Sequence, residues 1–316
     1  MRLDHPVFTN VDAARAHLEA QRWPNGPVCP HCGNVDQAKI TAMQGKAHRP
    51  GLYNCKECRE QFSVTVGTVF ERSKIALNVW MLATFLLSSS KKGMSAHQLH
   101  RMLGVTYKTA WFMAHRIREA MAPLKSETGP LGGEGKIVEA DTTYIGGKEK
   151  NKHAGKRDGK AIGGMGKQIV HTLVERGGHA RSHHIANVTG DTLRPILFTQ
   201  VDRKSSLMTD TAGGYHRLGK EFARHETVDH GADEYVRGDA YSNTVEGYFS
   251  ILKRGIIGIY HHVSEAHLMR YLAEFDFRYN HRSALKISDT ERTDAALAGI
   301  GGKRLTYRRI GEGANA

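Results

Sequence analysis

The chain has 316 residues, of which 40% are hydrophobic, so it is long enough for two or three domains with sizeable cores. Its 45 Lys and Arg residues outnumber its 32 Asp and Glu residues, and the formal charge of +13 predicts a polyanionic partner, with nucleic acid first and an anionic membrane surface second. A membrane-spanning or secreted protein is disfavoured, because the longest apolar run covers only residues 79–87 and the first ten residues lack the apolar stretch of a signal peptide. All four cysteines lie in C-x-x-C pairs, which favours a soluble protein of the reducing cytoplasm, near the nucleoid if the partner is DNA.

The first predicted element is a metal site within residues 1–68. The two pairs are Cys29/Cys32 and Cys55/Cys58, and strand-like sequence flanks the second pair, as in a zinc ribbon. Four thiolates fill the tetrahedral shell of one Zn²⁺ ion, which is typical of a structural site, so His31 inside the first pair is not expected to be a ligand. A redox-active C-x-x-C is the alternative, but two pairs in one short segment favour zinc.

Residues 69–125 are predicted to be helical. In the stretch SAHQLHRMLGVTYKTAWFMAHRIREAM, a turn at Gly104 separates two amphipathic helices, which is the shape of a helix-turn-helix. The second helix is the candidate reader of a DNA groove, and its Lys108 and Arg116 are candidate DNA contacts. The alternative is a plain helical hairpin that packs on its neighbours.

An α/β domain is predicted over residues 126–300. Residues 125–135 (KSETGPLGGEG) have the composition of a linker, and strand-like runs then alternate with helical patterns. The remaining residues 301–316 are basic and rich in glycine, and we expect a loosely ordered tail.

Two strand-like stretches of this domain carry acids. In KIVEADTTYIGG, Glu139 and Asp141 are two residues apart, so their side chains point to the same face of the strand. Two neighbouring carboxylates on one face cost free energy unless they are paired or bind a cation. In SSLMTDTAGGY, Asp210 ends a short apolar strand, the place where α/β sheets gather ligand sites. Each acid alone has an ordinary explanation, since Asp141 could end an exposed strand and Asp is a common turn residue.

The stretch SNTVEGYFSILKRG predicts an amphipathic helix. Asn243, Glu246 and Lys253 fall on one face, and the apolar side chains form a separate stripe. A glutamate on a surface helix is often only solvated, but the two strand acids would give this face a partner. The helix face and the two acids are therefore candidates for one site.

The chain thus has an acid on each of two strands, a third acid on a helix, and Lys253 two helical turns later. This order resembles the DDE signature of transposases and integrases. The four-cysteine ribbon and the motifs DTTYIGG, NTVEGYFSILKRG, YHHVSEAHL and FDFRYNHR extend the resemblance over roughly residues 20 to 285. Together they make the chain similar to the DDE transposases of bacterial insertion sequences that carry an N-terminal zinc ribbon.

This resemblance implies a ribonuclease-H-like catalytic domain with a mixed sheet, in which Asp141 and Asp210 are the first two catalytic acids and Lys253 is the downstream lysine. The third catalytic position varies between glutamate and asparagine in this family, and this chain has both Glu246 and Asn243. A carboxylate binds Mg²⁺ more strongly than an amide, so we favour Glu246 as the ligand and keep Asn243 in the site.

The resemblance also implies the reaction and its partners. Asp141, Asp210 and Glu246 would hold two Mg²⁺ ions, with Mn²⁺ as a substitute, during cleavage and transfer of DNA strands. The partners would be double-stranded DNA at the element ends and at the target, with the chain acting as a homo-oligomer in a synaptic complex. Asn280 and Arg282 also match a family motif, with packing or DNA contact as possible roles.

A basic, glycine-rich segment over residues 146–167 begins shortly after Asp141. We predict a mobile loop that follows DNA phosphates and gives salt-dependent affinity, although a solvated hairpin loop has the same composition. Its candidate DNA contacts are Lys148, Lys152, Lys156 and Arg157, in addition to Lys253 on the helix.

Two other functions remain open from the sequence. A zinc-ribbon and helix-turn-helix regulator without catalysis would have no need of acids that face DNA. A ribonuclease-H-like nuclease without strand transfer would have no need of a module that reads DNA ends. The histidine pairs at 183/184 and 261/262 are not predicted as metal ligands, because adjacent strand residues point to opposite faces.

Overall fold

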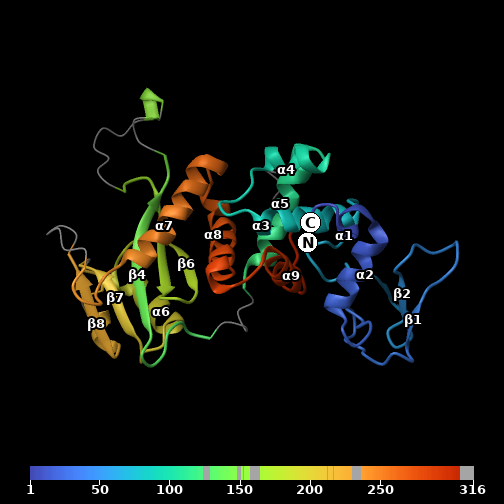
Figure 1. Cartoon of the computed structure of the whole chain (residues 1–316), viewed down its shortest axis with the longest axis horizontal. Coiled ribbons are helices and arrows are strands. Elements are labelled where there is room, and N and C mark those ends of the chain that lie inside the picture. The colour runs from blue at the N-terminus through green and yellow to red at the C-terminus, as the bar shows by residue number, and fades with distance from the viewer. Residues whose placement is uncertain are drawn as a thin grey trace. The chain divides into compact units, whose positions relative to one another are not determined.

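The computed structural model describes residues 1–123, 129–147, 151, 153–156, 164–211, 213–215, 217–229 and 236–306 (Figure 1). The chain forms two compact units. The first comprises Met1–Ala122 together with the segment from Ile287 onward, and the second comprises Pro123–Lys286. None of the helices in the described ranges combines the length and the apolar character that crossing a bilayer requires.

The first unit begins with a zinc-ribbon sheet beside two helices. Trp23 packs edge-on against the rings of Tyr53 and Phe62, with centroids 5.5 and 5.8 Å away, and these rings form the small core under the ribbon. The helices are α1 (Pro6–Thr9) and α2 (Val11–Arg22), and the antiparallel strands, in the order β1-β2-β3, are β1 (Ile40–Ala42), β2 (Tyr53–Cys55) and β3 (Gln61–Phe62).

The rest of the first unit is helical, as the sequence predicts. Its helices are α3 (Leu77–Ser89), α4 (Ala96–Leu103), α5 (Tyr107–Met121) and α9 (Asp289–Ala298). The turn between α4 and α5 depends on Gly104, whose φ of 66° is the left-handed conformation that glycine adopts readily. The side chains of Ser95 and Thr106 cap the two helices by accepting hydrogen bonds from backbone N–H groups. Helix α9 packs against α2, α3 and α5, although the sequence grouped residues up to 300 with the α/β domain.

A five-stranded mixed sheet is the centre of the second unit (Figure 1). The strand order is β6-β5-β4-β7-β8, in which β5 is antiparallel to both of its neighbours, β4 and β6, whereas β4, β7 and β8 are parallel. The strands are β4 (Ile137–Ile145), β5 (Gln168–Glu175), β6 (Ala180–Ile185), β7 (Ser206–Asp210) and β8 (Arg224–Val228).

Helices cover both faces of this sheet. Leu193 and Leu197 of α6 (Gly190–Gln200) pack on one face, in a core that includes Val138 and Leu173. The other face is covered by α7 (Asn243–Gly255), a π-helical turn η5 (Ile256–Tyr260) and α8 (Glu265–Asn280). Short 3₁₀ turns are η2 (Ala154–Lys156), η3 (Leu218–Glu221) and η6 (Ser283–Leu285). This mixed sheet between helices agrees with the expected ribonuclease-H-like architecture.

Side chains of α8 cover the open edge of the sheet at β6. The backbone N–H groups of Ala180 and Ser182, which point away from β5, donate to Asn280 Oδ1 at 2.6 Å and to Asp276 Oδ2 at 2.8 Å. The backbone N–H of His184 donates to the sulfur of Met269 in the same way. An edge strand whose outer N–H groups are satisfied cannot template pairing with another chain. The family-motif residue Asn280 therefore has a packing role.

Candidate functional site

The four cysteines of the ribbon come together as the sequence predicts. The Sγ atoms of Cys29 and Cys58 are 3.6 Å apart, those of Cys32 and Cys55 are 3.7 Å apart, and all four lie within 4.8 Å of one another. A tetrahedral Zn²⁺ ion with Zn–S bonds of about 2.3 Å would set its ligand sulfurs roughly 3.8 Å apart. The thiolate cluster therefore fits one structural Zn²⁺ ion.

The first two predicted acids lie side by side in the second unit. Strands β4 and β7 are parallel, and their register pairs Ala140 with Thr209. The next residue on each strand is Asp141 and Asp210, so the two acids are neighbours where β7 ends. Adjacent strands lie roughly 4.8 Å apart, a distance at which two carboxylates can share a cation.

Both acids also share a face of the sheet. Met208, two residues before Asp210, clusters with Ile137, and Asp141 lies four residues after Ile137 on β4. Side chains alternate along a strand, so Asp210 and Asp141 point to the same side as these two apolar residues. That side is the one that α7 covers, and both acids are partly exposed on it.

Helix α7 is attached to this face by Glu139. The side chain of Glu139 is fully buried, and its Oε2 accepts hydrogen bonds from the backbone N–H groups of Thr244 and Val245 at 2.8 and 2.9 Å. Its Oε1 accepts a further bond from Thr244 Oγ1 at 2.8 Å. The side chain of Ser242, at the helix N-terminus, makes no capping bond, so Glu139 supplies the acceptor that the first turn needs.

Arg176 completes this clamp from the end of β5. Its Nε donates to Glu139 Oε1 at 2.6 Å, and its two terminal nitrogens donate to the carbonyl oxygens of Asp239 and Tyr241 at 2.8 Å each. The guanidinium also lies 3.4 Å from the ring centroid of Tyr241. The sequence marked Glu139 only as a second acid beside Asp141. Its role could not be read from the sequence because its partners are remote along the chain, and the one available signal was an acid placed between the apolar residues Val138 and Ala140.

Helix α7 carries the other three predicted residues, and all three side chains are exposed. Asn243 and Glu246 lie in the first turn of α7, and Lys253 lies in its last turn. Ser242 Oγ donates to Glu246 Oε1 at 3.0 Å and orients that carboxylate. Because Glu139 holds the start of α7 and Ile256, just past its end, packs with Ile145, the helix runs along β4 in the strand direction. Asp141 therefore lies alongside the first turns of α7, where Asn243 and Glu246 are found.

A buried polar network lies on the opposite side of the strands. His171 Nδ1 is 3.2 Å from the hydroxyl of Tyr215 and 3.4 Å from Thr142 Oγ1. Burial lowers the pKa of His171 to about 3 and raises that of Tyr215. Burial also lowers the pKa of His183, which is paired with His171 across β5 and β6. Both imidazoles are neutral near pH 7, and the network ties the turn after Asp210 to β4.

The predicted DNA contacts have different surroundings. Lys108 is exposed on α5, whereas Arg116 is half-buried and donates to the carbonyl oxygens of Glu71 and Leu305. Burial lowers the pKa of Arg116. The structure thus gives Arg116 partners inside the first unit. Lys156 ends the turn η2. Lys148, Lys152 and Arg157 lie outside the described residues, as do residues 307–316 of the predicted tail.

Comparison with known proteins agrees with both the zinc ribbon and the domain that carries the acids. Residues 130–280 match the model of the ISXO2-like transposase domain, and residues 10–61 match that of the transposase zinc-ribbon domain. The chain is also 32% identical over 289 residues to a protein described as an uncharacterized protein in transposable element ISH50, from Halobacterium salinarum, covering 86% of this chain and 92% of that protein. This relative is archaeal, so the similarity is not confined to the bacterial elements that the sequence motifs suggested.

Proposed function

We propose that this chain, which belongs to the ISXO2-like transposases with a zinc ribbon, cuts DNA at the ends of its own insertion sequence and joins those ends to a target. The observation that supports this most is the placement of Asp141 and Asp210 side by side on parallel strands, under a helix that presents Asn243, Glu246 and Lys253. A regulator without catalysis would have no use for this arrangement.

The donor atoms of this site fit magnesium. Asp141, Asp210 and Glu246 offer carboxylate oxygens, Asn243 offers an amide oxygen, and Mg²⁺ prefers oxygen ligands. A bound pair of Mg²⁺ ions supplies activation of the attacking oxygen and stabilisation of the leaving oxygen. We favour Glu246 over Asn243 as the third ligand, because it is charged and is oriented by Ser242.

The remaining residues of the site position the helix and the DNA. Lys253 presents a point charge to a phosphate near the reacting strand. Glu139 and Arg176 hold the first turn of α7 against β4, which sets the position of Glu246 relative to Asp141. Neutral His171 stays out of proton transfer and supports the strand ends from the other side of the sheet.

DNA recognition belongs to the other elements in this proposal. The ribbon and the helix-turn-helix, with Lys108 exposed on its second helix, would read the terminal repeats of the element. The basic segment 146–167 would add affinity for phosphates without regard to sequence. Two DNA ends are joined to one target, so we propose that the chain acts as a homo-oligomer, on chromosomal DNA in the cytoplasm.

A strand-transfer assay tests the proposal. The protein is incubated with pre-cut DNA that carries the element's flanking terminal repeats, with Mg²⁺ or with EDTA, and the joined products are counted. We expect joining only with Mg²⁺, and we expect Asp141→Ala to bind the ends like the wild type in a gel shift and to join none. Binding without joining by the wild type would favour the regulator, and joining by Asp141→Ala would remove Asp141 from the site.

A further inference from the structure

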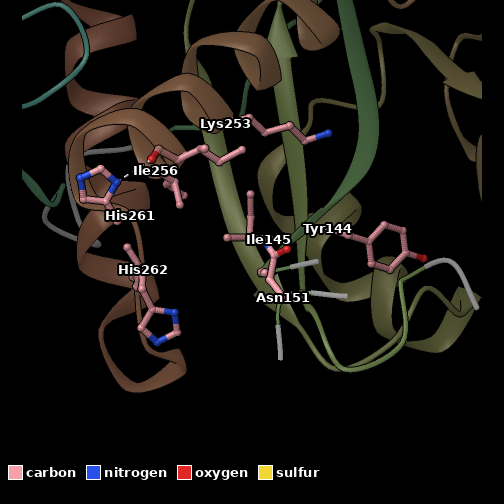
Figure 2. Close-up of a pocket in the computed structure, with 11 residues that line it drawn as sticks. Tyr144, Ile145, Asn151, Lys253, Ile256, His261 and His262 are labelled. Carbon is pink, nitrogen blue, oxygen red and sulfur yellow. Dashed lines mark hydrogen bonds between the residues drawn. The ribbon is translucent and has the colours of Figure 1, made fainter. Parts of the chain in front are cut away.

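Strand β4 presents different chemistry on its two faces. Ile145 packs in one core with Ile256, just past α7, whereas the ring of Tyr144 points away from Ile256 (Figure 2). Asp141 has the parity of Ile145, and the next residue, Thr142, has the parity of Tyr144. Thr142 therefore lies behind the acid, on the face of the sheet that packs against α6.

Thr142 joins the first acid to the buried network on that face. Its backbone N–H donates to Asp141 Oδ1 at 2.6 Å, and its Oγ1 is 3.4 Å from Nδ1 of the buried His171. The hydroxyl of Tyr215 lies 3.2 Å from the same nitrogen and also hydrogen-bonds the side chain of Thr142. Thr142 thus contacts the carboxylate with its backbone and the hydroxyl of Tyr215 with its side chain.

Tyr215 reaches this network from the turn that follows the second acid, Asp210. The tyrosine is 1% exposed, in the core between the sheet and α6. Burial raises the pKa of its hydroxyl, the bond with Thr142 opposes that shift, and the charges of Asp141 and Asp210 add to it. The hydroxyl is therefore close enough to both acids to be affected by their charges, and it connects the strand of the first acid to the turn after the second.

The second acid has a contact of the same kind on its own strand. Thr209 Oγ1 donates to the carbonyl oxygen of Asp210 at 2.8 Å and lies 3.0 Å from Nε2 of His225 on β8. A hydroxyl has one hydrogen, so His225 is the donor in the second contact. A Cβ atom on Gly219 would lie 1.9 Å from His225 Nδ1, so a larger residue there would displace the imidazole. Both acids are thus supported from the buried face of the sheet.

The sheet itself does not pair the two acids with each other. The paired residues of β4 and β7 end with Ala140 and Thr209, so the acids lie one position beyond the last pair. Each acid is paired with its outer neighbour instead, Asp141 with β5 and Asp210 with β8. A metal site keeps its affinity only while its ligands stay within roughly 0.5 Å of their positions. The separation of the two carboxylates therefore needs a further contact between their two segments.

We infer that Tyr215 is a positioning residue for the metal site, and that its hydroxyl sets the separation of Asp141 and Asp210 through Thr142 and His171. The inference rests on the proposed function and adds to it the group that holds the first two ligands at one distance. A tyrosine that served only the core would also fill this space, but its hydroxyl would have no effect on metal binding.

Metal binding by Tyr215→Phe tests this role, because the substitution removes the hydroxyl and keeps the ring in the core. Complexes of the protein with pre-cut element ends, without target DNA, are titrated with Mn²⁺, and free Mn²⁺ is measured by electron paramagnetic resonance. The complex of Asp141→Ala gives the ions that DNA binds by itself. We expect Tyr215→Phe to weaken the binding that depends on Asp141 by roughly 10- to 100-fold, the range for residues that orient metal ligands.

The matched control is Tyr260→Phe. It removes a tyrosine hydroxyl of the same unit that donates to Glu274 Oε1 on α8 at 2.6 Å, and it should leave Mn²⁺ binding unchanged. Urea denaturation of both variants in EDTA measures the loss of stability separately from the loss of metal. If Tyr215→Phe binds Mn²⁺ like the wild type, whatever its stability, the positioning role is refuted.

Substitutions of Thr142 test the same contact without altering the tyrosine. Thr142→Val has nearly the same shape but no hydroxyl and should weaken Mn²⁺ binding, whereas Thr142→Ser keeps the hydroxyl and should restore most of it. The double variant with Tyr215→Phe should bind no more weakly than the weaker single variant, because both changes break one connection. Equal binding by the valine and serine variants, or losses that multiply in the double variant, would contradict the connection. A wild-type complex that binds no more Mn²⁺ than Asp141→Ala would refute the proposed function, and this inference with it.

Discussion

The carboxylate of Glu139 accepts hydrogen bonds from both the backbone N–H and the hydroxyl of Thr244, which lies 105 positions further along the chain. This contact joins the strand that carries Asp141 to the helix that carries Glu246. One buried acid, absent from the predicted catalytic set, thus sets the relative position of two members of that set.

Removing this acid should destabilise the second unit. Glu139→Ala leaves Arg176 buried without its carboxylate and the first turn of α7 without an acceptor, and we expect a loss of about 3–5 kcal/mol in the free energy of unfolding. Urea denaturation measures this loss. The matched control is Glu221→Gln, because Glu221 is 48% exposed and lies 3.8 Å from Arg203. The control should change stability by about 0.5 kcal/mol or less. Equal effects of the two variants would show that Glu139 is not a clamp.

The ribbon should bind zinc through its four cysteines and without His31. We expect one Zn²⁺ per chain in the purified protein, and we expect its loss in Cys55→Ser, because three thiolates no longer close the shell. The fluorescence of Trp23, which packs on the ribbon residues Tyr53 and Phe62, should change with zinc removal. His31→Ala should keep its zinc. Full zinc content in Cys55→Ser, or a zinc-free His31→Ala, would contradict the four-thiolate site.

The buried carboxyl of Asp276 should make stability depend on pH. Burial raises its pKa from the ordinary 3.8 to about 6, against the hydrogen bonds it accepts from Tyr248 and Ser182. Between about pH 4 and 6 the folded protein keeps this proton and the unfolded chain releases it, so stability falls as pH rises. Two pKa units correspond to roughly 3 kcal/mol.

The variant that isolates this effect is Asp276→Asn, which resembles the protonated acid. Urea denaturation across pH 4 to 7 should show that the decline in stability over this range is largely absent in the variant. A decline as steep as that of the wild type would assign the pH dependence to other groups.

Glu246 and Asn243 can be separated by single substitutions. Glu246→Gln keeps the hydrogen-bond partner of Ser242 but removes the charge, and we expect it to lose strand cleavage while DNA binding is retained. Asn243→Ala should keep measurable cleavage at a reduced rate. Gel shifts and cleavage assays on the same DNA give both readouts. The opposite result, with Asn243→Ala inactive and Glu246→Gln active, would make Asn243 the ligand.

Local sequence predicts those parts of this protein whose chemistry is local. The cysteine pairs predict a metal site by their own spacing, and the strands that carry Asp141 and Asp210 are recognisable from their short apolar runs. The role of Glu139 could not be predicted, because its partners on α7 are over a hundred positions away. Arg116 is a second example. The sequence predicts it as a DNA contact, but it donates to the carbonyl oxygens of Glu71 and Leu305, which come from distant segments of the first unit.

The role of Asn280 and the packing of α9 also depend on tertiary contacts that the local sequence does not show. The motif that contains Asn280 gives it no role, whereas its hydrogen bonds to the backbone of Ala180, at the edge of the sheet, do. Helix α9 has the sequence of an ordinary amphipathic helix, and nothing within it shows that it packs with α2, α3 and α5.

The central claim is that Asp141, Asp210 and the acid of α7 hold metal ions against the phosphate that is cut. The most direct test replaces one non-bridging oxygen of that phosphate by sulfur and measures cleavage with Mg²⁺ and with Mn²⁺. Because sulfur is a poor ligand for hard Mg²⁺ and a better one for Mn²⁺, one stereoisomer should be cut roughly tenfold or more slowly with Mg²⁺, and Mn²⁺ should restore its cleavage. Equal loss with both metals, or cleavage that persists in EDTA, would contradict the account.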